Sequence, residues 1–260
     1  MSDLASPTWC SVADPIDGDE RLEAHWAAQL VAAPGTSLTP PAADYRHTAL
    51  TVTCGGMLAG ALVDDRRAAI DLRRLDLCWL QGDTSKRFPL IGQTLSAGLG
   101  WLSLAFGAEL VRPTHELPAH PVGEGAAFAR RSPGLAQWFM NAELVLHAFG
   151  QEHHVTPRCW PHHLDIAVLI PLDEETGEDA RSIGVGMSPG DDTFDQPYFY
   201  VTPWPYPSAE RLPTLVQGAW HTEGFVAAVL GEAAARRATQ ATVETFVHEA
   251  FAACSSLLAK

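Results

Sequence analysis

The sequence has 260 residues, 47% of them hydrophobic, which is enough to bury the core of one large domain or two small ones. Seventeen basic residues against 31 acidic ones leave a formal charge of −14, so the surface repels nucleic acid phosphates and anionic lipid headgroups. We therefore expect neither nucleic acid nor a membrane as a partner. No apolar run reaches the roughly 20 residues of a membrane helix, and the first 17 residues do not read as a signal peptide.

The cysteines indicate a reducing environment. They are five in number, scattered, and never spaced as a Cys-x-x-Cys pair: Cys10, Cys54, Cys78, Cys159 and Cys254. This pattern favours neither a disulfide framework nor a structural zinc site. We expect a soluble protein of the cytoplasm.

The first half of the chain is expected to begin with a helix and continue as a sheet. Leu22, Trp26 and Leu30 recur at helical spacing and predict a helix over 20–32, ended by a Pro/Gly/Thr loop through Pro41. Cys54-Gly55-Gly56 then gives the signal of a hairpin turn. The short strands predicted for an antiparallel meander are 47–53, 57–63, 68–72, 75–80 and 88–91.

A second helix is expected to close this half. Leu95, Leu99, Leu102 and Phe106 form one stripe of a helix over 93–106. The following segment, 112–133, lacks periodicity and is expected to be a surface excursion or a loop that covers a cleft.

The second half is expected to repeat the order of helix, sheet and helix. Apolar residues from Leu135 to Leu146 follow a helical stripe, and a last amphipathic helix is predicted over 239–258. Strands are predicted at 164–170, 182–187 and 198–202, with a helical stretch from Phe225 to Arg237.

We therefore predict an α+β fold of two helix–antiparallel meander–helix halves packed as one unit. The predicted parts are an N-terminal half over 1–111, a linker over 112–133 and a C-terminal half over 134–260 that carries the candidate site. A duplication of one half is a hypothesis, because the sequences of the halves are too different to establish it.

Four short motifs of the second half carry a resemblance. They are CWPHH-x-D at 159–165, SIGVG-x-SPGD at 182–191, PY-x-YV-x-PWPYP at 197–207 and WHTEG at 220–224. With these motifs the chain resembles a group of uncharacterised bacterial proteins of unknown function. The resemblance covers most of the second half, and it implies no activity and no catalytic residues.

The densest group of residues able to carry chemistry is Trp160 to Asp165, at the entry of a predicted strand. Because strand side chains alternate, we expect His163 and Asp165 on one face and His162 on the other. An imidazole and a carboxylate so placed can supply two metal ligands, or a base and the group that orients it. Equally, Asp165 can cap the strand while a histidine stacks on Trp160.

The second candidate is Trp220-His221-Thr222-Glu223. Its histidine and carboxylate are of catalytic type, but the zinc deaminase signature that begins with His-x-Glu also needs a Pro-Cys-x-x-Cys that is absent from the sequence. The alternative is a helix N-terminus at which Thr222 is the cap.

Two further signals are weaker. Gly186-Met187-Ser188-Pro189-Gly190 matches the nucleophile elbow of serine hydrolases, but Pro189 has no N–H for the oxyanion hole, so a tight turn is expected instead. Cys159 beside Arg158 can act as a nucleophile if its pKa is lowered, but no base is assured.

Glycines and aromatic residues suggest a pocket wall. Gly184 and Gly186 leave one face of their strand bare, and Tyr198 and Tyr200 share a face of the next strand. The bare face can receive these rings or a ligand. The stiff Pro-rich segment from Trp204 can wall a pocket or seal the sheet edge.

The leading hypothesis is a small-molecule site in the second half. Its catalytic residues are predicted to be His163, Asp165, His221 and Glu223, with His163, Asp165 and His221 as ligands if a divalent metal is bound. Its ligand-binding residues are predicted to be Trp160, His162, Tyr198, Tyr200, Trp204 and Trp220. The function expected is a hydrolase or lyase, metal-assisted if that ion is present; the alternative is a non-catalytic ligand-binding module or an interaction module that forms a homodimer.

Overall fold

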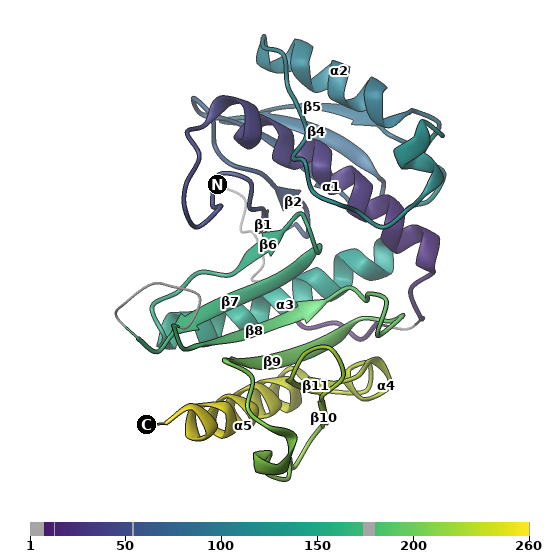
Figure 1. The fold of residues 1–260 in the computed structure, drawn as a ribbon. Helices are drawn as coiled ribbons and strands as arrows, with labels where there is room; N and C mark the ends of the chain where they lie inside the picture. The colour runs from purple at the N-terminus through teal and green to yellow at the C-terminus, as the bar shows by residue number, and fades with distance from the viewer. Residues whose placement is uncertain (1–7, 13, 54, 174–179, 260) are drawn as a thin grey trace. The chain divides into compact units, whose positions relative to one another are not determined.

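The computed structural model describes residues 8–12, 14–53, 55–173 and 180–259 (Figure 1). Its contacts divide the chain into two compact units. The N-terminal unit comprises 14–140 and 158–165, and the C-terminal unit comprises 141–157, 166–259 and the described residues before 13. The structure is an α+β fold, as predicted. Across the described part of the chain, no helix has both the length and the apolar character to cross a membrane.

The N-terminal unit has the predicted order of helix, meander and helix. Its five strands pair antiparallel in sequence order, α1 packs on β3, and α2 packs on α1 (Figure 1). The elements are α1 (Gly18–Leu38), β1 (Thr51–Val52), β2 (Leu58–Ala59), β3 (Arg66–Asp71), β4 (Asp76–Gln81), β5 (Thr84–Pro89) and α2 (Leu95–Phe106). Cys54 of the predicted hairpin turn lies outside the described residues.

Helix α1 runs past its predicted end at residue 32. Asp17 caps its start by accepting from the backbone N–H of Asp19, and the helix continues through Pro34 to Leu38. Proline removes one helical hydrogen bond, but residues 27–35 are all buried in this unit. Close packing of Gly35 on the backbone of His47 therefore outweighs the break that the sequence suggests.

The segment 112–133 is anchored by a few buried residues, although most of its residues are exposed. It contains the short 3-10 helix η1 (Pro121–Glu124), and Phe128 is buried and bridges Ile91 at the edge of the sheet. The buried carboxylate of Glu23 accepts from the backbone N–H groups of Ala129 and Arg130 at 2.8 and 3.0 Å. These bonds tie the segment to α1, so this surface stretch is anchored to the unit at a few points.

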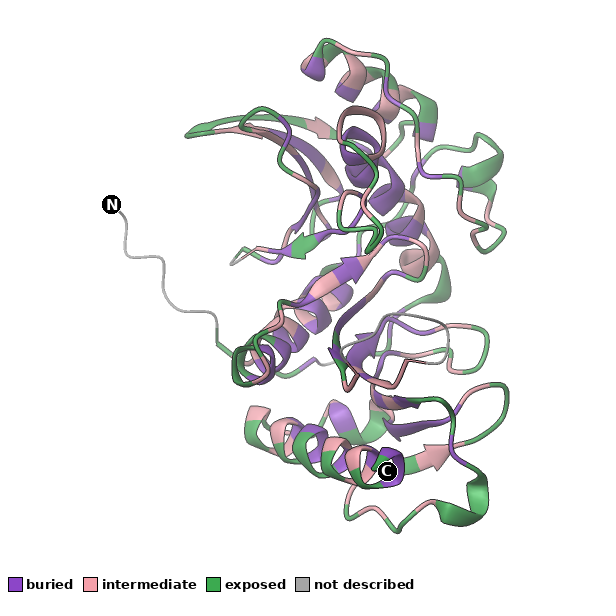
Figure 2. Ribbon diagram, turned by 60° about the vertical axis from the view of Figure 1, so that its left-hand side comes forward, coloured by how far each residue is buried: buried purple, intermediate pink, exposed green. Residues whose placement is uncertain are grey.

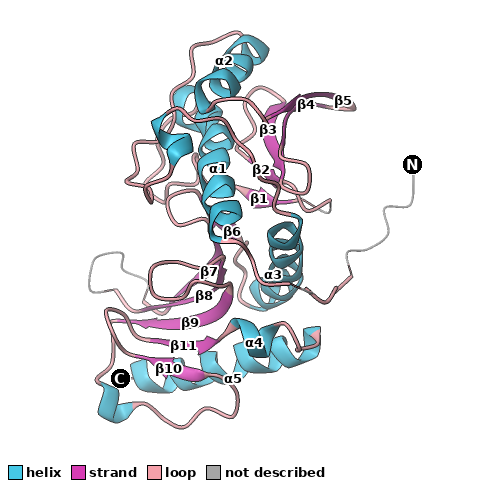
Figure 3. Cartoon of the chain, turned by 90° about the vertical axis from the view of Figure 1, so that its right-hand side faces the viewer, coloured by secondary structure: helices cyan, strands magenta, loops and turns pink. Residues whose placement is uncertain are grey.

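The C-terminal unit is an antiparallel sheet backed by helices (Figure 3). Strands follow each other in the order β10-β11-β9-β8-β7, and α5 packs along β8 and β9. The elements are β7 (Asp165–Pro171, of which Asp165 belongs to the other unit), β8 (Ser182–Ser188), β9 (Tyr198–Trp204), η2 (Ala209–Arg211), β10 (Ala219–His221), β11 (Ala227–Leu230), α4 (Glu232–Ala235) and α5 (Gln240–Leu258). Helix α3 (Pro133–Glu152) is divided between the units, and β6 (Arg158–Trp160) belongs to the N-terminal unit.

One face of this sheet is the core of the unit. Met187 and Phe199 have no exposed surface. Helix α5 buries the stripe that its period predicts, except for Phe251, which is half-buried. Buried and exposed residues alternate along this helix in Figure 2. The buried residues of α5 are Val243, Phe246, Val247, Ala250, Cys254, Leu257 and Leu258. The helical period of this segment therefore predicted both the helix and the face that it buries.

The stretch from Phe225 to Arg237 is not the predicted helix. It forms the strand β11, whose four residues are all buried, and then the four-residue α4. A short run of apolar residues is typical of a buried strand and of a buried helix alike, so the periodicity of the sequence cannot distinguish the two. Because β11 lies between β9 and β10, the sheet is not a simple meander, and a duplication of the two halves is not confirmed.

Two leucines of α2 allow a matched test of the core of the N-terminal unit. Leu102 has no exposed surface, whereas Leu104 is 84% exposed. We expect Leu102→Ala to lower the free energy of unfolding by about 2–5 kcal/mol, through lost burial and a cavity. Leu104→Ala should change it by less than about 0.5 kcal/mol. Urea denaturation followed by circular dichroism measures both, and equal losses would contradict the placement of α2.

Candidate functional site

The predicted site residues are divided between the two units. Trp160, His162, His163 and Asp165 belong to the N-terminal unit. The C-terminal unit holds the others, which are Tyr198, Tyr200, Trp204, Trp220, His221 and Glu223. The single polar centre of His163, Asp165, His221 and Glu223 therefore stays a prediction, and each group has its own geometry.

In the N-terminal unit, the two adjacent histidines lie in a turn. The carbonyl oxygen of Trp160 accepts from the N–H groups of His163 and Leu164, at 3.2 and 2.7 Å, and Leu164 has a positive φ of 57°. Strand β7 begins only at Asp165. The expected strand alternation of His162, His163 and Asp165 is therefore wrong, because the chain turns before it becomes extended.

This turn gathers a histidine cluster of His25, His115, His162 and His163. The ring centres of His162 and His163 are 4.4 Å apart, and those of His115 and His162 are 5.3 Å apart. The ring centre of Trp160 is 6.2 Å from that of His162, but the two rings are tilted by 54° and not stacked as the alternative suggested. His25 of α1 and His115 of the segment 112–133 were not expected to join them.

Two buried side chains of α1 hold the turn from beneath. His25 is 5% exposed, and its Nε2 lies 2.9 Å from the carbonyl oxygen of Pro161. Gln29 has no exposed surface and donates to the same oxygen at 2.5 Å. Because a carbonyl only accepts, Nε2 of His25 carries the proton that it donates.

Burial keeps His25 and His162 uncharged at neutral pH. It lowers the pKa of His25 from 6.5 to about 4, and it is also the main cause that lowers the pKa of His162 to about 4. Mutual repulsion within the cluster adds to the effect, and burial lowers the pKa of His115 as well. A base that is half-protonated near pH 4 has little driving force for proton abstraction at pH 7. His162 is thus better suited to packing or hydrogen bonding than to general-base catalysis.

The cluster also differs from a metal centre. Among the residues described, no group of three or more His, Cys, Asp or Glu side chains is placed so that it could hold a metal ion. The metal ligands His163, Asp165 and His221, and an enzyme that uses them, stay predictions of the sequence.

Cys159 is buried rather than activated. It has no exposed surface, it bridges Leu50 through its backbone, and burial raises the pKa of its thiol well above the ordinary value. The charge of Asp165 adds to this rise. Arg158 instead pairs with Asp44, at 3.0 Å. The hypothesis that Cys159 has a lowered pKa and acts as a nucleophile is therefore wrong.

In the C-terminal unit, the loop after β8 forms the expected turn. The hydroxyl of Ser188 accepts from the N–H of Gly190 at 3.2 Å, which replaces the geometry of a nucleophile elbow. Asp191 then organises the loop, since its Oδ1 accepts from the N–H groups of Thr193 and Phe194. Its Oδ2 accepts from the hydroxyl of Tyr198 at 2.6 Å.

Tyr198, Tyr200 and His221 are brought together, as the sequence suggested. They lie with Phe194 and Phe225 in an aromatic cluster whose neighbouring ring centres are 4.4–6.1 Å apart. Tyr200 stands over Gly186, where an added Cβ would lie 2.6 Å from the ring. The bare glycine face is therefore filled by a side chain of the chain itself.

The imidazole of His221 contacts the backbone of Glu223 rather than its carboxylate. Nε2 of His221 lies 2.6 Å from the backbone oxygen of Glu223, and the Glu223 side chain belongs to an exposed residue. No helix follows to be capped by Thr222, because β10 ends at His221 and a turn leads to β11. The imidazole is thus used to fix this turn.

Trp204 and Trp220, the two predicted tryptophans of the C-terminal unit, have other partners. The indole of Trp220 donates to the carbonyl of Pro213 at 2.8 Å. Trp204 precedes a cis peptide bond to Pro205 and packs edge to face with Tyr206, and both rings are more than 40% exposed. Neither indole lines the pocket described next.

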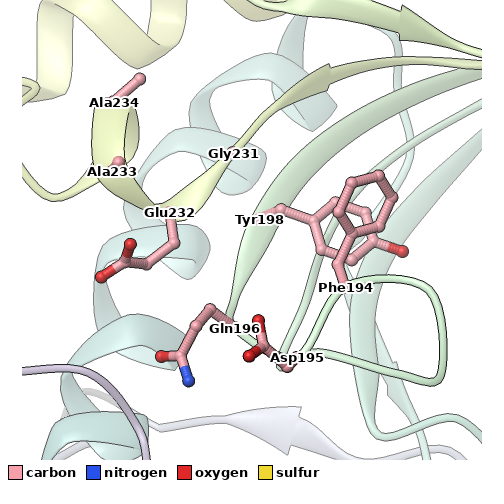
Figure 4. A pocket seen from close by; sticks show the side chains of 8 residues that line it. All are labelled: Phe194, Asp195, Gln196, Tyr198, Gly231, Glu232, Ala233 and Ala234. Atoms are coloured by element: carbon pink, nitrogen blue, oxygen red, sulfur yellow. The ribbon is translucent and has the colours of Figure 1, made fainter.

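A pocket of about 370 Å³ opens where β9 begins and β11 ends (Figure 4). Phe199 pairs with Leu230, so Tyr198 and Gly231 are the next residues along these two antiparallel strands. The pocket is lined by Phe194, Asp195, Gln196, Tyr198, Gly231, Glu232, Ala233 and Ala234. Figure 4 shows Asp195 and Gln196 between Glu232 and the two rings.

Only Tyr198 of this lining was predicted from the sequence. Asp195 and Gln196 are single polar residues of a loop, and Glu232 is the first residue of the short α4, and none of them belongs to a motif. The signal that could have indicated them is the Ser-Pro-Gly-Asp turn, because a tight turn beside an aromatic strand fixes the loop that follows it.

The comparisons with known proteins add no relative. No protein-family model, curated protein or solved structure matches the chain. The resemblance of its motifs to a group of bacterial proteins stays a prediction, and the candidate sites depend on their own geometry.

The low pKa of His25 predicts acid sensitivity of the N-terminal unit. The imidazole binds its proton at about pH 4 when folded and at 6.5 when unfolded, so the unfolded state gains protons first as the pH falls. The free energy of unfolding should therefore fall by about 3 kcal/mol between pH 6.5 and 4 through this group. In His25→Gln, which keeps a donor for Pro161 but does not titrate, that part of the pH dependence should be absent. Urea denaturation at several pH values tests this, and parallel curves for the two proteins would contradict it.

The cysteines should differ in reactivity. Cys10 is exposed, whereas Cys78, Cys159 and Cys254 are buried, and burial raises the pKa of these three thiols. Since the thiolate is the reactive form, we expect iodoacetamide to modify Cys10 in the native protein and the buried three only after denaturation. Peptide mass spectrometry measures this, and rapid native labelling of Cys159 would show that its burial is wrong.

Proposed function

We propose that the protein binds a small molecule in the pocket between the start of β9 and the end of β11. The observation that supports this most is the composition of the pocket: two aromatic rings stand beside three polar side chains in a space of about 370 Å³. Ligand pockets are of this size, and they combine apolar surface with a few polar groups that orient the ligand.

The scaffold favours a preformed site. Tyr198 is 4% exposed and is held by Asp191, which also holds the backbone of the loop that carries Phe194. Glu232 is held by Arg236 at 2.7 Å. Side chains that are fixed before binding lose less conformational entropy when a ligand arrives.

The residue types that line the pocket favour binding of a ligand without catalysis. Within the lining of the pocket, there is no histidine, cysteine, serine or lysine. The pKa of His162, about 4, makes it a weak base at neutral pH. The hydrolase or lyase with a divalent metal, the homodimer and the cytoplasmic location are predictions of the sequence that no contact of the pocket supports or opposes.

A bulky side chain at the pocket tests the proposal. Ala234 lines the pocket, whereas Ala252 is exposed on α5 and does not line it. We expect fragments found by ligand-observed NMR to lose binding to Ala234→Trp, because an indole fills the space, and to keep it with Ala252→Trp. Absence of any fragment binding, or equal binding to both variants, would overturn the proposal.

A further inference from the structure

We infer that the ligand of this pocket is a small organic cation, a primary amine or a guanidinium that carries an aromatic or apolar group. The inference rests on the proposed function and adds the class of ligand to it. Three observations carry it: an unpaired carboxylate, a half-buried ring beside it, and a lining without a basic residue.

The first observation is the state of Asp195. It is exposed at the pocket, and among the described residues its carboxylate has neither a hydrogen bond nor an ion pair. Its neighbour in the lining, Glu232, already accepts from Arg236 through Oε1. The side chain that is left to meet a positive group is therefore Asp195.

The second observation is the position of the Phe194 ring. It is half-buried, its centre is 4.6 Å from that of Tyr198 and 5.2 Å from that of His221, and it lines the pocket. The neighbouring rings hold it in place. A cation gains from the face of a fixed aromatic ring as well as from a carboxylate, so a ring next to Asp195 favours an ammonium or guanidinium group.

The third observation is the sign of the charge. Asp195 and Glu232 are the charged residues of the lining, and both are acidic. The nearby Arg236 is engaged by Glu232 and by the carbonyl of Val12. An anionic ligand would meet the carboxylate of Asp195 without a counter-charge, and the formal charge of −14 would slow its approach. The amide of Gln196 can orient either kind of ligand.

Matched pairs of ligands separate charge from shape. Benzylamine and benzyl alcohol, and phenethylamine and 2-phenylethanol, have nearly the same size but differ in charge at pH 7. We expect each amine to bind about tenfold or more tightly than its alcohol, measured by NMR titration, with benzoate weaker than both. All should lose binding to Ala234→Trp.

Asp195→Asn and Asp192→Asn form the control pair. Both remove one negative charge from the same exposed loop, but only Asp195 lines the pocket. We expect Asp195→Asn to abolish the preference for the amine, and Asp192→Asn to leave it. An equal loss in the two variants would mean that the overall charge attracts the amine, and would overturn the inference.

The outcomes also separate the inference from the proposed function. If alcohols and amines bind equally, and Ala234→Trp removes both, the pocket binds ligands but does not select a cation. If neither class binds, the proposed function fails as well.

Discussion

The backbone pairing of β9 with β8 on one side and β11 on the other is the constraint on which the C-terminal unit depends. Gly186 pairs with Tyr200, and Phe199 pairs with Leu230. Strand side chains alternate, so a slip of one residue would turn the tyrosines toward α5 and Phe199 to the open face. The register therefore decides which side chains are core and which are available for a ligand.

The strands alone do not make the pocket. Asp191 accepts two backbone N–H groups and the Tyr198 hydroxyl, so the loop between β8 and β9 is held at both of its ends. The carboxylate of Asp191 thus connects the turn, the Tyr198 ring and the start of β9. In this arrangement the buried face supplies stability, and a loop held by its own hydrogen bonds supplies part of the pocket lining.

The sequence predicted those elements whose periodicity reflects burial on one face. The helix α5 and its stripe from Val243 to Leu257 are examples, and so is the alternation that places Tyr200 over Gly186. The predictions from the sequence were wrong where tertiary packing outweighs the local preference of a residue, as at Pro34 in α1. They were also wrong where every residue of a strand is buried, as in β11.

The candidate site was predicted in part for a related reason. The adjacent histidines were recognised as a cluster, but their partners His25 and His115 come from distant segments that only folding brings near. The pocket residues Asp195 and Glu232 had no signal, because the register of β9 with β11 places them together. A pattern along the chain cannot show a contact that depends on strand order.

The histidine cluster and the pocket differ in how far their polar side chains are buried. In the histidine cluster burial removes charge from His25 and His162, because a buried imidazolium loses its hydration and repels its neighbours. At the pocket, Asp195 stays exposed and keeps the hydration that an ionised carboxylate needs. A charge that remains hydrated until a partner arrives costs little to maintain and still favours a ligand of opposite sign. Of these two groups of polar residues, the pocket is thus the better suited to select a ligand by its charge.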